Sequence, residues 1–320
     1  MLKIRTLQIS DFDRFQELIN QFPDLKKLTN HKAFALLQFY IPHNLRILPS
    51  IHIATDQKNI LGFIILESLS KANNAWEIKQ IFIQDEQRNQ DLGEELLKYV
   101  LSVYGSYGIE FFLGEVNSQN YNAISLFHKC GFRRYAKVCM YSKEITEVLN
   151  NDASALTDDF TLRAQDKNDL NDIVKLDLSC IPPDLRPAIG RSKHYFQAKK
   201  NAFVIIDNSR NLIVGWFNIE ESEKNIFSLE LLISPGWTYL YGDTINTVIS
   251  SCRENNNHSF LLSIRAIDYN TELTELLSKS GFLASEVKEL LVRTIWQKTK
   301  VKQKELAKII FPSTQPVRGS

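Results

Sequence analysis

Residues 76–100 read WEIKQIFIQDEQRNQDLGEELLKYV. The first part, 76–83, is rich in β-branched and aromatic residues, which predicts a strand. After a polar turn, apolar residues recur at helical spacing from Leu92 to Val100. We therefore expect a strand that leads through a short loop into a helix. The start of such a helix has unpaired backbone N–H groups and the positive end of the helix dipole, which together favour an anion.

A second strand and helix follow at once. Residues 111–116 (FFLGEV) predict a strand, and residues 120–132 (NYNAISLFHKCGF) predict a helix that begins at Asn120. The helix ends at Gly131, which suits the left-handed residue that commonly follows a helix. One strand–loop–helix unit is typical of any α/β protein, so the prediction depends on the two units in this order. Residues 135–143 are then expected to form the strand that closes the sheet.

These two units resemble the GNAT superfamily of N-acetyltransferases. The first motif of that family, R/Q-x-x-G-x-G/A, corresponds to residues 88–93 (RNQDLG). The second motif, N-x-x-A-x-x-L-Y-x-x-x-G-F, corresponds to residues 120–132. The resemblance implies that acetyl-coenzyme A (acetyl-CoA) binds with its pyrophosphate on the loop amides and its pantetheine arm along the strand. The cofactor-binding residues that it implies are Ile81, Phe82, Ile83, Arg88, Asn89, Gln90, Asp91, Leu92, Gly93, Glu94 and Asn120.

Two residues depart from the family pattern. Asp91 stands where the family has glycine, and its carboxylate could cap the helix or repel the pyrophosphate. At 4 Å this repulsion is about 1 kcal/mol in water and about 4 kcal/mol at an effective dielectric of 20, so we expect a weakened site. Phe127 stands where the family often has a tyrosine that is proposed to protonate the leaving thiolate, and phenylalanine has no proton to donate.

Glu77 is the candidate general base, since several family members have a glutamate at this place in the strand. Amine acetylation needs such a base, because an ammonium group cannot attack a thioester. The alternative is a solvated strand glutamate. Arg88 is the candidate partner of the pyrophosphate, which suits a bidentate guanidinium. The alternative is an ordinary arginine of a surface loop.

The composition narrows the class of protein. The length of 320 residues suits two domains, and the formal net charge of +1 gives no electrostatic reason to expect nucleic acid or an acidic membrane as partner. The sequence contains no run of about 18 apolar residues, so it predicts no membrane-spanning helix. The four cysteines and six histidines show neither disulfide nor metal-binding spacing. We expect a cytoplasmic protein without a metal, and the sequence leaves its oligomeric state open.

The second half of the sequence repeats the first. The recurring pairs are Arg5 with Arg163, Asp11 with Asp169, Gly62 with Gly215, Asn120 with Asn270 and Gly131 with Gly281, at separations from 150 to 158. Such ordered repetition indicates a duplicated unit. We predict an α/β (mixed α+β) protein of two tandem GNAT folds, each a mostly antiparallel mixed sheet flanked by helices. The predicted domains are 1–146 and 160–297, with a linker at 147–159 and a tail at 298–320.

The second copy lacks the first motif. Residues 234–243 read SPGWTYLYGD, and Trp237 and Tyr241 are bulky where a pyrophosphate requires close backbone approach. We therefore expect coenzyme A in the first copy alone. The resemblance implies transfer of an acetyl group to an amine. A small-molecule amine is favoured over a protein amine as the acceptor. In this family the acceptor is held by variable loops, such as residues 25–49 here. A non-catalytic acyl-CoA-sensing module and an interaction scaffold remain as alternatives.

Overall fold

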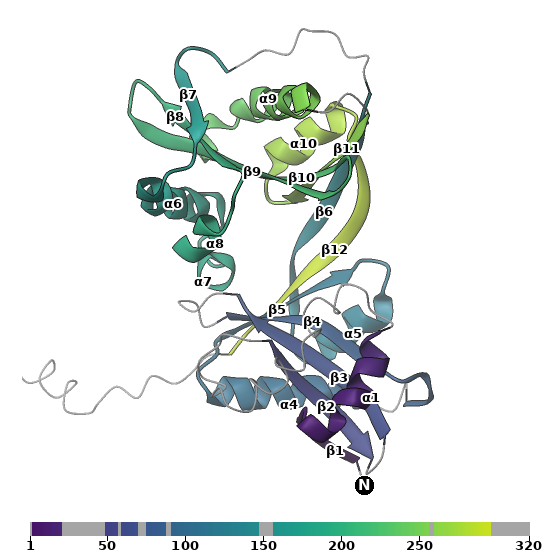
Figure 1. The fold of residues 1–320 in the computed structure, drawn as a ribbon. Helices are drawn as coiled ribbons and strands as arrows, with labels where there is room; N and C mark the ends of the chain where they lie inside the picture. The colour runs from purple at the N-terminus through teal and green to yellow at the C-terminus, as the bar shows by residue number, and fades with distance from the viewer. Residues whose placement is uncertain are drawn as a thin grey trace, which may run out of the picture.

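The computed structural model describes residues 2–20, 49–56, 59–69, 75–87, 91–146, 156–255 and 259–295. The loop residues Arg88, Asn89 and Gln90, the tail at 298–320, and most of the linker and of the loop 25–49 lie outside the described residues. Figure 1 shows two lobes joined by a pair of long strands.

From residue 75 onward, the first half follows the order of strands and helices that the sequence predicts. Its described strands are β1 (Leu2–Thr6), β2 (Ser50–Asp56), β3 (Asn59–Ser68), β4 (Ala75–Ile83), β5 (Phe111–Asn117) and β6 (Arg133–Ile145). Its described helices are α1 (Phe12–Ile19), α4 (Leu92–Ser106) and α5 (Tyr121–Lys129). β2 and β3 are almost wholly buried, because helices cover both faces of the sheet.

The second half repeats the described order of the first half. Its strands are β7 (Phe160–Ala164), β8 (Ala202–Asp207), β9 (Leu212–Glu223), β10 (Ile226–Ile233), β11 (Phe260–Ile267) and β12 (Leu283–Thr294). Its helices are α6 (Leu170–Cys180), α7 (Arg186–Ile189), α8 (Lys193–Gln197), α9 (Leu240–Asn255) and α10 (Thr271–Lys279). The short helices α7 and α8 lie between α6 and β8, where the counterpart in the first half is outside the described residues.

The twelve described strands form one sheet in the order β1-β2-β3-β4-β5-β12-β6-β11-β10-β9-β8-β7. Among them, β4 with β5 and β10 with β11 are the parallel pairs, and the other neighbours are antiparallel. The predicted class, a mixed α/β fold with mostly antiparallel sheet flanked by helices, is confirmed.

Strands β6 and β12 are exchanged between the halves. β6 pairs with β11 along Val138–Ile145, whereas β12 pairs with β5 along Lys288–Thr294. The two exchanged strands also pair with each other, side by side between the lobes (Figure 1). The sequence predicts residues 135–143 as the strand that closes the first sheet, but in the structure they complete the second. The exchange adds the β6–β12 ladder, which joins two sheets into one.

An arginine–aspartate pair is repeated in the two halves. Arg5 donates to both oxygens of Asp11 at 2.5 and 3.0 Å, and Arg163 donates to both oxygens of Asp169 at 2.7 and 2.8 Å. In each half the carboxylate also accepts a backbone N–H bond from the residue three positions earlier. The repeat seen in the sequence is therefore a repeated interaction that ties the first strand to the first helix.

Helices pack on both faces of the sheet in each half. On one face lie α4 and α5 in the first half and α9 and α10 in the second, while α1 and the pair α6 and α8 cover the opposite faces. The segment 181–189 of the second half, which contains α7, packs on β4 and β5 of the first half. Its buried Leu185 and Ala188 share an apolar cluster with Ala75 and Leu113. The second half thus covers part of the first.

Candidate active site

A cleft opens between β4 and β5. The two strands pair in parallel along 75–78 and 111–114, after which β4 continues to Ile83 and β5 to Asn117 without pairing with each other. On its other side, β4 stays paired with β3 as far as Ile83. The edge of residues 79–83 that faces β5 can therefore offer backbone N–H and C=O groups to a ligand.

The cleft has a volume of about 820 Å³ and is bordered by β4, the start of α4, β5 and α5. Its size suits an extended organic ligand. The predicted cofactor residues on its wall are Ile81, Phe82, Ile83, Asp91, Leu92, Gly93, Glu94 and Asn120. Arg88, Asn89 and Gln90 fall outside the described residues, so their role stays a prediction.

Asp91 immediately precedes α4 with a left-handed backbone, at φ 56°. Glycine adopts this conformation at least cost, which explains why the family motif has glycine at this position. The Asp91 side chain is 75% exposed and accepts no hydrogen bond from an N–H group of α4. It therefore does not cap the helix, which was one of the two roles that the sequence left open. The N–H groups at the start of this helix are not occupied by its carboxylate.

Lys129 brings a positive charge to the same end of the cleft. Its Nζ lies 3.9 Å from Asp91 Oδ1 and 4.0 Å from Glu94 Oε2. Glu94 is also 2.5 Å from Lys98, and this hydrogen bond holds the pKa of Glu94 below its ordinary value. The two acidic side chains are therefore partly neutralised where a phosphate would bind. Sequence reasoning missed Lys129, although it lies on the helix that Asn120 begins.

Two glycines allow close packing beside the cleft. A Cβ at Gly93 would lie 3.2 Å from Leu126 Cδ2, so glycine allows α4 to approach α5. Gly114 leaves room for the ring of Phe127, which is buried and packs edge-on against Phe132. Phe127 is thus a packing residue, and it has no proton for a leaving thiolate.

Glu77 lies on the face of β4 that is turned away from α4, because its neighbours Trp76 and Ile78 pack toward that helix. Its side chain is 16% exposed, and its Oε2 is 2.6 Å from Lys79 Nζ. Lys79 lies on the cleft wall. Glu67 of β3 stands directly opposite Glu77 in the strand register, with its Oε2 3.9 Å from the same ammonium. Two carboxylates therefore meet at Lys79, which is the one of these three residues that lines the cleft.

Burial raises the pKa of Glu67, the Lys79 charge opposes that rise, and the Glu77 charge adds to it. A carboxyl group with a raised pKa beside a cleft is a candidate for proton transfer. Sequence reasoning did not single out Glu67. The available signal was the hairpin of β3 and β4, whose register sets Glu67 against Glu77.

The matching region of the second half has a buried tyrosine at the start of its helix. β10 and β11 also stop pairing, after Leu229 and Ile264. Helix α9 begins with leucine as α4 does, and its second residue is Tyr241 where α4 has Gly93. Tyr241 is 3% exposed, and its hydroxyl accepts a 2.7 Å hydrogen bond from Asn270. Burial raises the pKa of Tyr241 to about 12.

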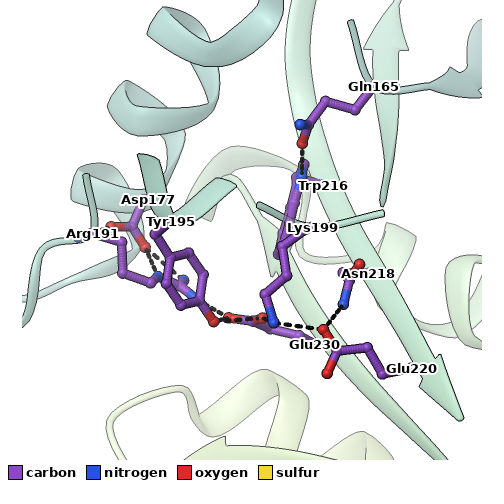
Figure 2. A network of polar contacts seen from close by, with 9 residues as sticks. All are labelled: Gln165, Asp177, Arg191, Tyr195, Lys199, Trp216, Asn218, Glu220 and Glu230. Atoms are coloured by element: carbon purple, nitrogen blue, oxygen red, sulfur yellow. Dashed lines mark hydrogen bonds and ion pairs between the residues drawn. The ribbon is translucent and has the colours of Figure 1, made fainter. Parts of the chain in front are cut away.

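A network of ion pairs and hydrogen bonds supports β10 from the side of α6 and α8, as Figure 2 shows. The Tyr195 hydroxyl lies 2.8 Å from both carboxylate oxygens of Glu230, which also pairs with Arg191. Arg191 in turn donates to the fully buried Asp177 at 2.6 and 2.9 Å. Because Arg191 and Lys199 each pair with two carboxylates, this network acts as internal support for the second half.

Three further features of the described residues concern metal binding, membrane-spanning helices and the cysteine thiols. Among them, no cluster of histidine, cysteine, aspartate or glutamate side chains is arranged to hold a metal ion. In the same part of the chain, no helix has both the length and the apolar character that crossing a membrane requires. The cysteines at 130, 139, 180 and 252 are free thiols.

Comparisons with known proteins bear on the family and the fold. Residues 13–132 match the acetyltransferase (GNAT) family. A GCN5-related N-acetyltransferase from Sphaerobacter thermophilus is similar at a TM-score of 0.58 and 13% identity, over 94% of this chain and 98% of that one. A tandem GNAT protein from the clavulanic acid biosynthesis pathway gives a TM-score of 0.60 at 10% identity, over 93% and 100% of the two chains. No curated protein matches the sequence significantly. The predicted tandem form of the fold is confirmed.

Proposed function

We propose, on the premise that residues 13–132 are a GNAT acetyltransferase domain within a tandem GNAT fold, that this protein transfers the acetyl group of acetyl-CoA to an amine. One observation carries the proposal: the free edge of residues 79–83 ends close to the start of α4, within a single cleft. This arrangement suits a ligand with a long amide-bearing arm and a phosphate at one end.

The donor would bind in the first half. The N–H groups at the start of α4 and the ammonium of Lys129 suit the pyrophosphate, and the edge from Ile81 to Ile83 suits the amides of the pantetheine arm. In the second half, the buried Tyr241 takes the place of Gly93 near the start of the helix, which supports one donor site per chain. The reaction so described uses no metal.

The chemistry would take place at the inner end of the cleft. Glu77, with Glu67 as a second candidate, would remove a proton from the acceptor ammonium. A backbone N–H group of the free β4 edge would stabilise the developing oxyanion. Because Phe127 cannot protonate the departing thiolate, we expect a slower reaction than in enzymes with a tyrosine there.

The acceptor would bind where the two halves meet. The segment 181–189 covers Ala75 and Leu113, which flank Glu77 along the strand and across it. Arg265 of β11 forms an ion pair with Glu115 of the cleft wall. The second half therefore provides a wall beside the candidate base, which suits a small-molecule amine enclosed on several sides. We propose the cytoplasm as the location, in keeping with four free cysteine thiols.

Lys129→Ala tests the donor site, with Lys279→Ala as its matched control, because Lys279 ends α10 as Lys129 ends α5. Calorimetry should show one acetyl-CoA per chain. Lys129→Ala should weaken binding about threefold to fivefold at low salt, since an exposed ion pair contributes up to about 1 kcal/mol. Lys279→Ala should leave the affinity unchanged. Two donor sites per chain, or equal effects of both variants, would contradict this assignment.

A non-catalytic acyl-CoA sensor is the second candidate function, favoured by the charge of Asp91 and by Phe127 in place of tyrosine. An amine screen that follows release of the coenzyme A thiol separates the two. Turnover with an amine supports the transferase. Tight binding of acetyl-CoA without consumption by any amine supports the sensor.

A further inference from the structure

Lys79 holds an unusual position in β4. In the pairing of β3 with β4, Gln80 stands opposite Ile65 and Ile78 stands opposite Leu66, so Lys79 is the extra residue of a β-bulge. It lies on the cleft wall where β4 and β5 begin to separate. The bulge lies within the stretch of β4 that borders the cleft.

The ammonium of Lys79 is already placed as an acceptor amine would be. Its Nζ lies 2.6 Å from Glu77 Oε2, which is within reach for direct proton transfer. It lies 3.9 Å from Glu67 Oε2. The Lys79 side chain is 35% exposed, and the residue lines the cleft.

Acetyl-CoA would reach the Lys79 amine if its pyrophosphate and its pantetheine arm bind as proposed above. With the phosphates at the start of α4, the pantetheine arm runs along the free edge from Ile83 toward Lys79. At about 3.3 Å per residue, that edge is roughly 13 Å long. The acetyl thioester is then at the inner end of the cleft, beside Lys79. Lys129, which also lines the cleft, is at the opposite end beside Asp91.

We propose that Lys79 is itself an acetyl acceptor and that the protein acetylates its own Nζ from acetyl-CoA bound in the cleft. This inference rests on the proposed function. Glu77 takes one proton from the ammonium, and the freed electron pair forms a bond to the thioester carbonyl carbon. The C–S bond breaks, and its electron pair leaves on sulfur. The second proton lost from nitrogen converts the thiolate to the thiol of coenzyme A.

The product has a direct consequence for the site. An acetylated Nζ is neutral, so Glu67 and Glu77 lose the positive charge that now lies near both of them. Burial and the Glu77 charge already raise the pKa of Glu67, and loss of the Lys79 charge would raise it further. Self-acetylation therefore changes the protonation of the same carboxyl groups that would act on a free amine.

The test uses the full-length chain with isotopically labelled acetyl-CoA and no added amine, followed by intact mass and peptide mapping. We expect one label per chain at Lys79, at a rate per molecule that does not depend on protein concentration. Lys79→Arg should abolish the label and Lys279→Arg should keep it. Glu77→Gln should slow labelling about 100-fold, the usual contribution of a general base. A thermal melt of each variant checks its folding.

Chemical acetylation gives a different pattern. It follows exposure, so it would favour Lys175 and Lys279, whose side chains are 78% and 76% exposed. Labels spread over such residues and unaffected by Lys79→Arg would overturn the inference. An unlabelled Lys79 in a chain that acetylates an added amine would overturn it and leave the proposed function standing. A chain that neither binds acetyl-CoA nor acetylates any amine would overturn both.

Discussion

Asp91 combines an unfavourable backbone with an unfavourable charge. Its φ is 56°, and its carboxylate lies beside the start of α4, where a phosphate is expected. Asp91→Gly removes both, so we predict that it tightens acetyl-CoA binding. The gain should be at most about fivefold at low salt, since about 1.4 kcal/mol corresponds to tenfold and Lys129 already offsets part of the charge.

Asn225→Gly is the matched control for Asp91→Gly. Asn225 also has a left-handed backbone, at φ 64°, but it lies in the second half, in the turn between β9 and β10. It should relieve backbone strain without changing acetyl-CoA affinity. Dissociation constants at two salt concentrations measure both variants, and the gain from Asp91→Gly should shrink as salt rises. Weaker binding by Asp91→Gly would mean that its carboxylate contacts the donor usefully.

Glu77→Gln should lower kcat about 100-fold and leave the dissociation constant of acetyl-CoA unchanged, because a base acts on the acceptor and not on the donor. Glu67→Gln tests the neighbouring carboxyl group. A base works only when deprotonated, so the rate rises with pH, and the raised pKa of Glu67 moves that rise above the ordinary glutamate range. If Glu67→Gln removes the rise and Glu77→Gln does not, Glu67 is the base.

At the scale of the elements, the Arg163–Asp169 ion pair joins β7 to α6. We predict that it makes the stability of the fold depend on pH in acid. Hydrogen bonds from Arg163 hold the pKa of Asp169 below its ordinary value. A carboxyl with a lowered folded pKa stabilises the fold above its unfolded pKa, near 3.9 for aspartate, and this contribution is lost as pH falls through the folded value. Asp169→Asn should therefore cost about 1 kcal/mol near neutral pH, because the Arg163 side chain is 41% exposed and water can solvate its charge once the carboxylate is lost.

Urea unfolding at several pH values measures this cost. The difference between Asp169→Asn and the unaltered chain should shrink as pH falls below about 4, because the carboxyl of the unfolded chain takes up a proton there before the native carboxyl does. Asp172→Asn is the control, since Asp172 is 54% exposed and pairs with the exposed Lys175. It should change stability by no more than about 0.5 kcal/mol. An Asp169→Asn difference that persists unchanged into acid would exclude the charge as its cause.

The elements around the cleft were accessible from the sequence because each leaves a local pattern. β4 is a β-branched run, α4 and α5 have helical periodicity, and Gly131 ends α5 with φ 81°. Lys129 and Glu67 were missed because their roles depend on which residues lie opposite them in space. That information is held in the register of the hairpin and in the packing of α5 on α4.

At the scale of the whole molecule, the exchange of β6 and β12 could not be predicted from the sequence, because it also depends on which residues lie opposite each other in space. β6 has one hydrophobic pattern, and that pattern allows it to close either copy of the sheet. The choice is made by pairing between strands that are far apart in sequence. The repeat itself was predictable, because the duplicated residues keep their order, but the path of the chain between the repeats was not. The domain boundaries at 146 and 160 stay a prediction, since β6 lies within the sheet of the second half.

Because of this exchange, we predict that neither half folds alone as a monomer. A fragment of residues 1–150 lacks β12, the neighbour of β5, and a fragment of residues 151–320 lacks β6, which lies between β12 and β11. Mixed together, the two fragments should assemble and bind acetyl-CoA. Circular dichroism and size-exclusion chromatography of each fragment and of the mixture provide the measurement. A monomeric 1–150 fragment with a cooperative melt would contradict the prediction.

The same exchange also sets the order in which the protein matures during synthesis. The ribosome completes β5 long before it makes Leu283–Thr294, the strand that pairs with it. At about 5–20 residues per second, the edge of β5 waits on the order of ten seconds or more for its partner. An unpaired strand edge invites pairing with other chains, so nascent chains need protection during this interval. A premature stop codon before Leu283 would leave the first copy open as well as the second, although every residue of the candidate site had already been translated.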